Sequence, residues 1–231
     1  MDKAVKTNFV SYPPLTPPYR VLVLDDHQFI VELLSSGLSN DSNIKVVGVA
    51  KSGEAAISIA KDRVIDIALL DMALSEGDGI SVAKEMLKLR PGIRLIGLSA
   101  FIKSHYPQTL LEYGARGFIG KNASVKELLT GIRRVANGEL AITAEVAYEL
   151  ATTNAGSGLL SRGKNLSPRE KEVLELIAKG YGAARIANEL GVKEKTVAAH
   201  RSEIRKKLEL SNDVEICLYA LRSGLVSLSE S

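Results

Sequence analysis

Short apolar runs alternate with longer amphipathic stretches through the first 140 residues, and this alternation constrains the fold more than any other feature. The run IALL at 67–70 is apolar at every position, as in a strand covered on both faces. Strands of this kind, separated by helices, predict a doubly wound parallel sheet of the α/β class. Five strands are expected, at Arg20–Leu24, Lys45–Ala50, Asp66–Leu70, Arg94–Leu98 and Gly117–Gly120, with helices near 27–39, 53–63, 79–89, 104–113 and 124–137.

A second, wholly helical part follows a stretch that loses all periodicity. The letters TTNAGSG at 152–158 are small and polar, as in a flexible linker. Beyond them, Ser167, Pro168 and Glu170 form a helix start signal with a capping box, and a compact four-helix unit is expected. Its helices are predicted at 168–180, 183–190, 195–208 and 214–223, and a further short helix is predicted before the linker, near 144–151. The expected organisation is a disordered N-terminal lead at 1–18, a first domain at 19–140, a helix and flexible linker at 141–163, and a second domain at 164–231.

Cysteine, hydropathy and charge narrow the class of protein. Cys217 is the only cysteine, so an internal disulfide is impossible and a reducing compartment is indicated. No window holds the roughly 18 uncharged apolar residues of a membrane span, and prolines interrupt the N-terminus where a secretory signal would be apolar, so a cytoplasmic protein is expected. Residues 153–231 hold 13 Lys and Arg against 10 Asp and Glu, which accounts for the whole net charge of +3 and points weakly to an anionic partner there.

Carboxylates stand at the ends of two predicted strands. Asp25 and Asp26 end the first strand and Asp71 ends the third, and these strands are neighbours in the usual order of such a sheet. Three converging carboxylates with hard oxygen ligands predict a Mg²⁺ site. Ser99 and Lys121 reach the same edge from the fourth and fifth strands. Any one of these residues alone is ordinary surface chemistry, but together they suit transfer of a phosphoryl group to Asp71.

Several stretches carry a family resemblance. VLVLDDH, LLDMALSEGDGI, LSA and GARGFIGKNAS resemble a response-regulator receiver domain, which has a flavodoxin-like fold, and residues 166–208 are similar to a LuxR-type helix-turn-helix. The chain as a whole resembles the NarL/FixJ class of two-component transcription factors, which are not enzymes. The resemblance implies a sensor histidine kinase as phosphodonor, promoter DNA as target and a homodimer on DNA. It also implies Mg²⁺ held directly by Asp26, Asp71 and the Ala73 carbonyl and through water by Asp25, with Ser99, Phe118 and Lys121 as switch residues.

Three departures from the family pattern stand out. Ser75 replaces the usual proline, which should loosen its loop without touching a ligand. Gly182 and Lys193 replace the Ser or Thr that usually precedes the two DNA-reading helices, and because Lys is a poor N-cap, the second helix is expected to fray by a residue or two. Ala198 and Ala199 stand where many relatives place a lysine and a bulkier apolar residue.

The second helix of a helix-turn-helix lies in the major groove, with its N-terminal half near the bases. Base reading is expected from Lys195, Thr196 and Arg201, with methyl contacts from the two alanines and with Arg205 and Lys206 on phosphates. For 205–207, a solvated helix end favoured by the helix dipole is an equal alternative. His200 is expected to be structural, and neither His27 nor His105 has a partner at ligand spacing. The predicted interface comprises Lys195, Thr196, Ala198, Ala199, Arg201, Ser202, Arg205 and Lys206, and the predicted core face Val197, Ile204 and Leu208.

Two other functions compete with this interpretation. Phosphatases of the haloacid-dehalogenase type also use a strand-end Asp with Mg²⁺, but they need a second Asp two residues later, where this chain has Ala73. A DNA-binding regulator whose first domain is a fixed dimerisation module without phosphorylation is also possible, although the Asp71, Ser99 and Lys121 set argues against it. No Gly-rich phosphate loop supports nucleotide binding.

Overall fold

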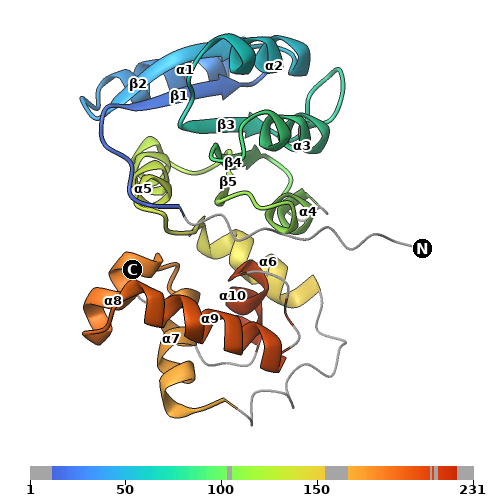
Figure 1. Cartoon of the computed structure of the whole chain (residues 1–231). Helices are drawn as coiled ribbons and strands as arrows, with labels where there is room; N and C mark the ends of the chain where they lie inside the picture. Colours follow the sequence, from blue (N-terminus) through green and yellow to red (C-terminus); the bar gives the residue numbers. More distant parts are fainter. Residues whose placement is uncertain (1–11, 103–105, 154–165, 209, 211–212, 223–231) are drawn as a thin grey trace. The chain divides into compact units, whose positions relative to one another are not determined.

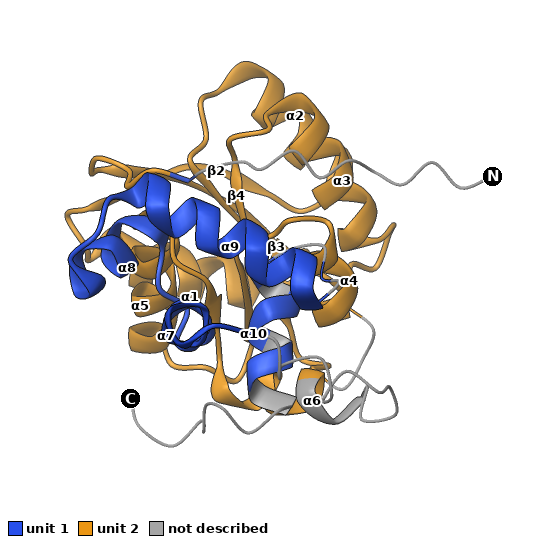
Figure 2. Ribbon diagram, turned by 60° about the horizontal axis from the view of Figure 1, so that its bottom comes forward, with its two compact units in different colours: residues 1–12, 151–231 blue, residues 13–150 orange. Residues whose placement is uncertain are grey.

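The computed structural model describes residues 12–102, 106–153, 166–208, 210 and 213–222 (Figure 1). It divides into two compact units, drawn in separate colours in Figure 2. The first unit runs from Pro13 to Leu150, and the second takes in Tyr12 and the described residues from Ala151 onward. None of the helices in the described ranges has the length and apolarity needed to cross a membrane.

A six-stranded parallel sheet forms the centre of the first unit, in the order β2-β1-β3-β4-β5-β6. The strand order reverses between β1 and β3, which are neighbours as expected. The five predicted strands are confirmed to within a residue at each end, because their apolar runs are covered on both faces. The strands are β1 (Tyr19–Leu24), β2 (Ile44–Ala50), β3 (Ile67–Asp71), β4 (Arg94–Ser99), β5 (Gly117–Gly120) and β6 (Ala141–Ile142).

Helices cover both faces of this sheet (Figure 1). α1 (Gln28–Ser39) and α5 (Val125–Ala136) pack together on one face, and α2 (Gly53–Asp62), α3 (Gly79–Leu89) and α4 (Tyr106–Glu112) follow one another on the other. The five helices were predicted from their apolar periodicity. The core on the first face consists of Leu34, Leu38, Leu128, Ile132 and Val135 packed against the strand residues Val21, Val23, Ile67, Leu69, Ile96, Leu98 and Ile119.

The sixth strand corrects the prediction of a five-stranded sheet. β6 pairs with β5 through Gly117 opposite Ala141 and Phe118 opposite Ile142. It follows α5 after a turn at Gly138, whose φ of 78° is in the left-handed region that favours glycine. A strand of two residues leaves no periodic pattern, which is why it was not predicted. α6 (Ala144–Thr153) then forms as predicted, so the first unit extends past residue 140, and residues 154–163 of the predicted linker lie outside the described ranges.

The N-terminal lead is attached to the sheet through a buried arginine. Arg94, at the start of β4, is only 2% exposed, and its guanidinium donates to the carbonyls of Val135 (2.5 Å) and Ala136 (2.7 Å) and to that of Pro13. The N–H of Leu15 also donates to Ala136 O, at 2.7 Å, and Leu15 packs against the core. A cation at the last carbonyls of α5 complements the helix dipole. The expectation of a disordered lead is therefore wrong for residues 13–18, and residues 1–11 lie outside the described ranges.

Removal of residues 1–18 is expected to lower the free energy of unfolding of the first unit by about 2 kcal/mol, because the buried Arg94 guanidinium loses a hydrogen-bond acceptor. Amide hydrogen exchange of the β4 strand in the whole chain measures this change. Removal of residues 1–11 is the matched control, since it leaves Pro13 and Leu15 in place. Equal exchange in the two truncated proteins would show that the lead adds nothing to stability.

The second unit is helical in its described part. It contains α7 (Pro168–Ala178), α8 (Ala183–Leu190), α9 (Glu194–Leu208) and α10 (Asp213–Arg222). The predicted capping box is confirmed: Ser167 N donates to the Glu170 carboxylate (2.7 Å) and Glu170 N to Ser167 Oγ (3.2 Å). α9 begins one residue earlier than predicted, directly after Lys193. The predicted core positions are confirmed, since Val197, Ile204 and Leu208 are all fully buried.

Candidate functional site

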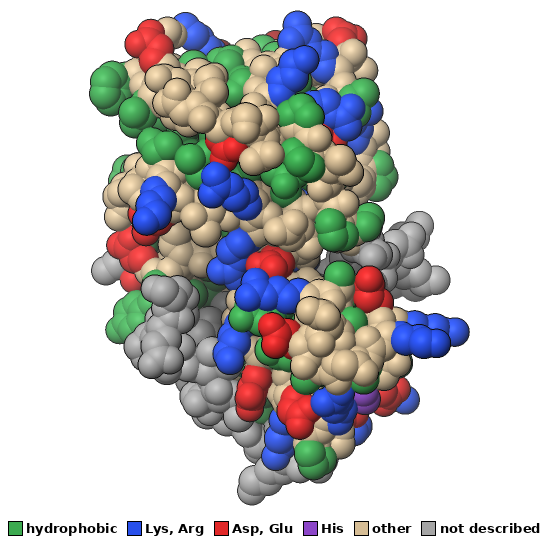
Figure 3. Space-filling view, turned by 90° about the vertical axis from the view of Figure 1, so that its left-hand side faces the viewer, with side chains coloured by type: hydrophobic (Ala, Val, Ile, Leu, Met, Phe, Trp, Pro, Cys, Tyr) green, Lys and Arg blue, Asp and Glu red, His purple; other side chains and the backbone are tan. Residues whose placement is uncertain are grey.

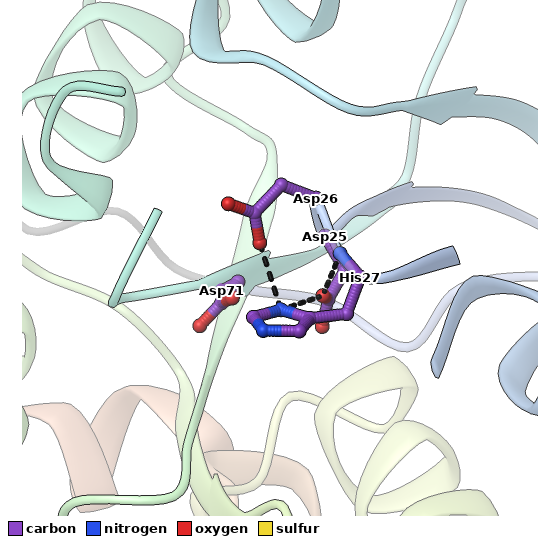
Figure 4. Close-up of side chains that lie close together, drawn as sticks. All are labelled: Asp25, Asp26, His27 and Asp71. Carbon is purple, nitrogen blue, oxygen red and sulfur yellow. Dashed lines mark hydrogen bonds and ion pairs between the residues drawn. The ribbon is translucent and has the colours of Figure 1, made fainter. Parts of the chain in front are cut away.

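Three carboxylates meet where β1 and β3 end, as the sequence predicts. Leu24 lies opposite Leu70 in the register of the two strands, so Asp71 and the Asp25–Asp26 pair end at the same edge. Asp25 and Asp71 are buried, at 0% and 1% exposure, and the side chain of Asp26 is 14% exposed. One ligand atom from each of these residues and from His27 lies within 4.8 Å of the others (Figure 4).

Lys121 joins this cluster from the end of β5. Its Nζ lies 2.7 Å from Asp25 Oδ2 and 2.7 Å from Asp71 Oδ2, so one ammonium contacts both buried carboxylates. Burial tends to lower the pKa of Lys121, but its hydrogen bonds to Asp25 and Asp71 outweigh burial and raise the pKa above the ordinary value. The lysine is therefore charged at neutral pH.

The pKa values of Asp71 and Asp26 are shifted in opposite directions. Burial raises the pKa of Asp71 above its ordinary value, although hydrogen bonds from Lys121 and from the Ala73 N–H act in the opposite direction. Burial acts to raise the pKa of Asp26 as well, but hydrogen bonds from Ser75 and the neighbouring His27 outweigh it and lower the pKa. Asp26 therefore stays ionised to lower pH than Asp71.

The two remaining switch candidates lie on β4 and β5 and are buried. Ser99 ends β4, and its Oγ accepts a hydrogen bond from the N–H of Phe101 at 2.9 Å rather than contacting a carboxylate. The ring of Phe118 is fully buried. Gly97 leaves room for this ring, since a Cβ there would lie 2.8 Å from Phe118 Cδ2 and 2.4 Å from Leu110 Cδ2.

His27 takes part in the cluster, contrary to the expectation that it has no partner at ligand spacing. Its ring Nδ1 lies 2.8 Å from Asp26 Oδ1 and 3.3 Å from Asp25 Oδ1 (Figure 4). Its main-chain N–H donates to Asp25 Oδ1 at 2.9 Å. The sequence signal was its place directly after the acid pair. His105 lies outside the described ranges.

The loop between β3 and α3 donates N–H groups to two of the three carboxylates. Ala73 N donates to Asp71 Oδ1 at 3.0 Å, and Ser75 N donates to Asp26 Oδ2 at 2.6 Å. The expectation that Ser75 touches no ligand is therefore wrong. The loop ends where Gly79 begins α3 directly against β3: a Cβ on Gly79 would lie 2.4 Å from the Asp71 carbonyl oxygen, so only glycine allows this approach.

The donor set suits a hard divalent cation. Asp25 Oδ2 and Asp26 Oδ1 are buried oxygens, and each has a single basic side chain beside it, Lys121 at 2.7 Å and His27 at 2.8 Å. Carboxylate oxygens with spare acceptor capacity at one point are the ligands that Mg²⁺ selects. The residues present therefore fit the predicted cation.

In the second unit, α9 presents a mixed, exposed face. Figure 3 shows one side of the molecule, on which basic and acidic side chains are interspersed rather than gathered into one basic patch. His200 is only partly exposed, and Arg205 is half-buried, with its pKa lowered by burial. The predicted interface residues that are exposed are Lys195, Thr196, Ala198, Ala199, Ser202 and Lys206.

Arg201, which is predicted to contact bases, is buried and paired within the second unit. Its side chain is 8% exposed, and Nη1 lies 2.8 Å from Asp213 Oδ2 at the start of α10, while Nη2 donates to the Tyr181 carbonyl before α8 at 3.0 Å. Arg201 thus ties α9 to α10 and to the turn before α8. Lys207 is exposed and is also paired, at 2.7 Å from Oε2 of Glu170, a residue of the α7 capping box.

The chain is similar to known regulators over most of its length. Residues 21–133 match the response regulator receiver domain, and residues 164–220 match the bacterial regulatory proteins of the luxR family. The response regulator protein VraR of Staphylococcus saprophyticus is 33% identical over 209 residues, which cover 90% of this chain and 99% of VraR. VraR of Staphylococcus aureus is 32% identical over 207 residues, covering 90% and 98%.

Solved structures share the fold. The structure of the two-component response regulator RcsB in complex with DNA is similar, with a TM-score of 0.54 at 22% identity. The match covers 88% of this chain and 98% of that one. A LuxR-family response regulator from Aurantimonas has a TM-score of 0.55 at 22% identity, covering 58% and 96%.

Proposed function

The chain belongs to the response regulators that join a receiver domain to a LuxR-type DNA-binding domain, and from this premise we propose that a phosphoryl group on Asp71 controls its binding to promoter DNA. One observation carries the proposal: Asp71 is buried beside Asp25 and in contact with Lys121, at the point where strand order reverses. Ligands of open α/β sheets bind at this point.

Asp25, Asp26, Asp71 and the Ala73 carbonyl would hold Mg²⁺, whose charge would offset that of the phosphoryl oxygens. In the transfer, an Asp71 carboxylate oxygen attacks the phosphorus of a phosphohistidine on a sensor kinase. The P–N bond breaks, its electron pair stays on the nitrogen that carried the phosphoryl group, and the imidazole leaves neutral with its proton on the other ring nitrogen. Lys121, already between Asp25 and Asp71, supplies a fixed positive charge to the new acyl phosphate.

The proposed switch begins at Ser99. Its hydroxyl would leave the Phe101 N–H and donate to a phosphoryl oxygen, so that the segment after β4 moves. Phe118, buried beside Gly97, would fill the space behind this segment. The charge added at Asp71 would then bias a two-state surface formed by α4 and β5, and promoter binding would follow that bias, including formation of a homodimer on DNA.

The exposed face of α9 would read the DNA. Lys195 and Thr196, in its first turn, would reach base edges, and Ala198 and Ala199 can offer methyl contacts suited to thymine. Ser202, Arg205 and Lys206 would lie against phosphates. Exposure supports this proposal: all of these residues except the half-buried Arg205 are exposed, whereas Val197, Ile204 and Leu208 are buried.

The test is capture of genomic fragments by the whole chain with and without a small acyl-phosphate donor and Mg²⁺. The expected result is enrichment of fragments that share a short sequence, stronger with the donor, because phosphorylation shifts the receiver. In the Asp71→Asn protein, enrichment is expected to be the same with and without the donor. If the wild type captures its fragments equally in both conditions, the receiver acts as a fixed module. If it captures none and releases phosphate catalytically, the chain is a phosphatase.

A further inference from the structure

The two oxygens of the Asp26 carboxylate have different surroundings. Oδ1 is buried and lies within the cluster, 2.8 Å from the His27 ring. Oδ2 accepts the Ser75 N–H at 2.6 Å. In Figure 4 one oxygen of Asp26 is directed to His27 and the other points away from the cluster. The Ser75 bond thus fixes the rotation of the carboxylate, with Oδ1 turned inward.

We infer that Ser75 is a positioning residue whose backbone N–H holds Asp26 Oδ1 toward the cation site, an inference that rests on the proposed function. Asp26 is the most exposed of the three carboxylates, and Lys121 contacts the other two, so Asp26 is held by the His27 ring at Oδ1 and by Ser75 at Oδ2. Partners that orient a metal-binding carboxylate strongly affect metal affinity.

The same loop orients a second ligand. Ala73 N donates to Asp71 Oδ1, and two residues later Ser75 N donates to Asp26 Oδ2. These carboxylates follow different strands, β3 and β1, so the loop fixes one against the other. A loop that is already bonded to both ligands needs less rearrangement when the cation enters.

The main-chain N–H makes the short bond to Oδ2, and the serine hydroxyl also hydrogen-bonds to the Asp26 carboxylate. Any residue except proline offers an N–H at this position. Proline is the usual residue at this place in the family that the sequence resembles, so the usual sequence could not make the bond. Position 75 therefore departs from that pattern by offering a main-chain N–H to Asp26.

Calorimetric titration of the whole chain with Mg²⁺ tests the role of Ser75. Ser75→Pro removes the N–H, and its dissociation constant for Mg²⁺ is expected to rise roughly tenfold. Ser75→Ala, the matched control, removes the hydroxyl but keeps the N–H, and its dissociation constant is expected to rise by much less than that of Ser75→Pro. Equal affinities of Ser75→Pro and wild type, with normal labelling of Asp71, would overturn the role of Ser75 and leave the proposed function standing. A wild type that binds no Mg²⁺ would overturn both.

Nuclear magnetic resonance of the residue 75 amide separates loss of the bond from distortion of the loop by proline. In the wild type and in Ser75→Ala this amide proton is expected downfield, because it donates to a carboxylate over a short distance. Asp26→Ala is expected to move it upfield in both proteins, while the Ala73 amide keeps its position. An amide proton at residue 75 that does not respond to Asp26→Ala would overturn the inference, whatever the proline variant does.

Discussion

Arg201→Ala is expected to unfold most of the second unit and to abolish binding to every DNA sequence alike. The substitution leaves the mostly buried Asp213 carboxylate without its cation and the Tyr181 carbonyl without its donor. Breaking a buried ion pair costs about 3–5 kcal/mol. That is a large share of the stability of a small helical unit. Circular dichroism at 222 nm, followed through urea unfolding of the whole chain, is expected to lose the transition of this unit.

Lys195→Ala is the matched control, because it removes a cation from the exposed face of the same helix. It is expected to leave the unfolding transition unchanged and to weaken binding to captured DNA. The double substitution Asp213→Asn with Arg201→Ala should lower the free energy of unfolding by less than the two single substitutions added together. Neither partner is then left as an unpaired charge. If Arg201→Ala unfolds as the wild type does and loses only sequence-specific binding, Arg201 contacts bases as the sequence pattern indicated.

Asp71→Asn is expected to abolish labelling by a small acyl-phosphate donor. The amide is neutral and is not a nucleophile. Among the described carboxylates, Asp25 alone shares with Asp71 both the Lys121 contact and a position at the end of a strand. Intact-mass measurement of the whole chain with donor and Mg²⁺ detects the gain of one phosphoryl group. Labelling that persists in Asp71→Asn, or that a chelator leaves unchanged, would contradict the assignment, and Asp25→Asn separates a phosphoacceptor from a cation ligand.

The pH dependence of labelling has a defined sign. The attacking form of Asp71 is the carboxylate, and burial raises its pKa. Labelling should therefore decline, as the pH falls, at a higher pH than for an ordinary aspartate. Lys121 has a raised pKa and Asp26 a lowered one, so neither loses its charge as the pH falls from neutral through this decline. A rate that stays constant to below the ordinary range of aspartate would contradict the raised pKa.

Periodicity was sufficient to predict the five long strands and the helices between them, because a buried parallel strand and an amphipathic helix each leave a pattern. The strand-end rule then placed Asp25, Asp26, Asp71 and Lys121 together without knowledge of any contact. β6 was not predicted, because a strand of two residues is too short to show an alternating pattern. Arg94 was missed because an arginine at the start of a strand is ordinarily solvated, and its acceptors lie more than 40 residues away.

The errors at functional positions have a common origin. Arg201 was assigned to DNA from its charge and its place in the motif, but its burial depends on Asp213, on the following helix. The Ser75 contact was missed because a main-chain N–H is present in almost every residue and has no signature in the sequence. Residue type thus predicted which groups can do the chemistry, whereas the partners that orient them come from distant segments.

The pairing of Arg201 and Lys207 within the second unit bears on how the regulator responds to its own abundance. The exposed cations of α9 are Lys195, Lys206 and Lys207, and Lys207 is paired with Glu170. Each phosphate contact contributes roughly −0.9 to the slope of log affinity against log salt, so α9 alone supplies little attraction at cellular ionic strength. Two copies on adjacent half-sites would add their contacts, and each would raise the effective concentration of the other at the promoter. Occupancy would then follow the square of the amount of active protein, and a gradual rise in phosphorylation would become a threshold in transcription.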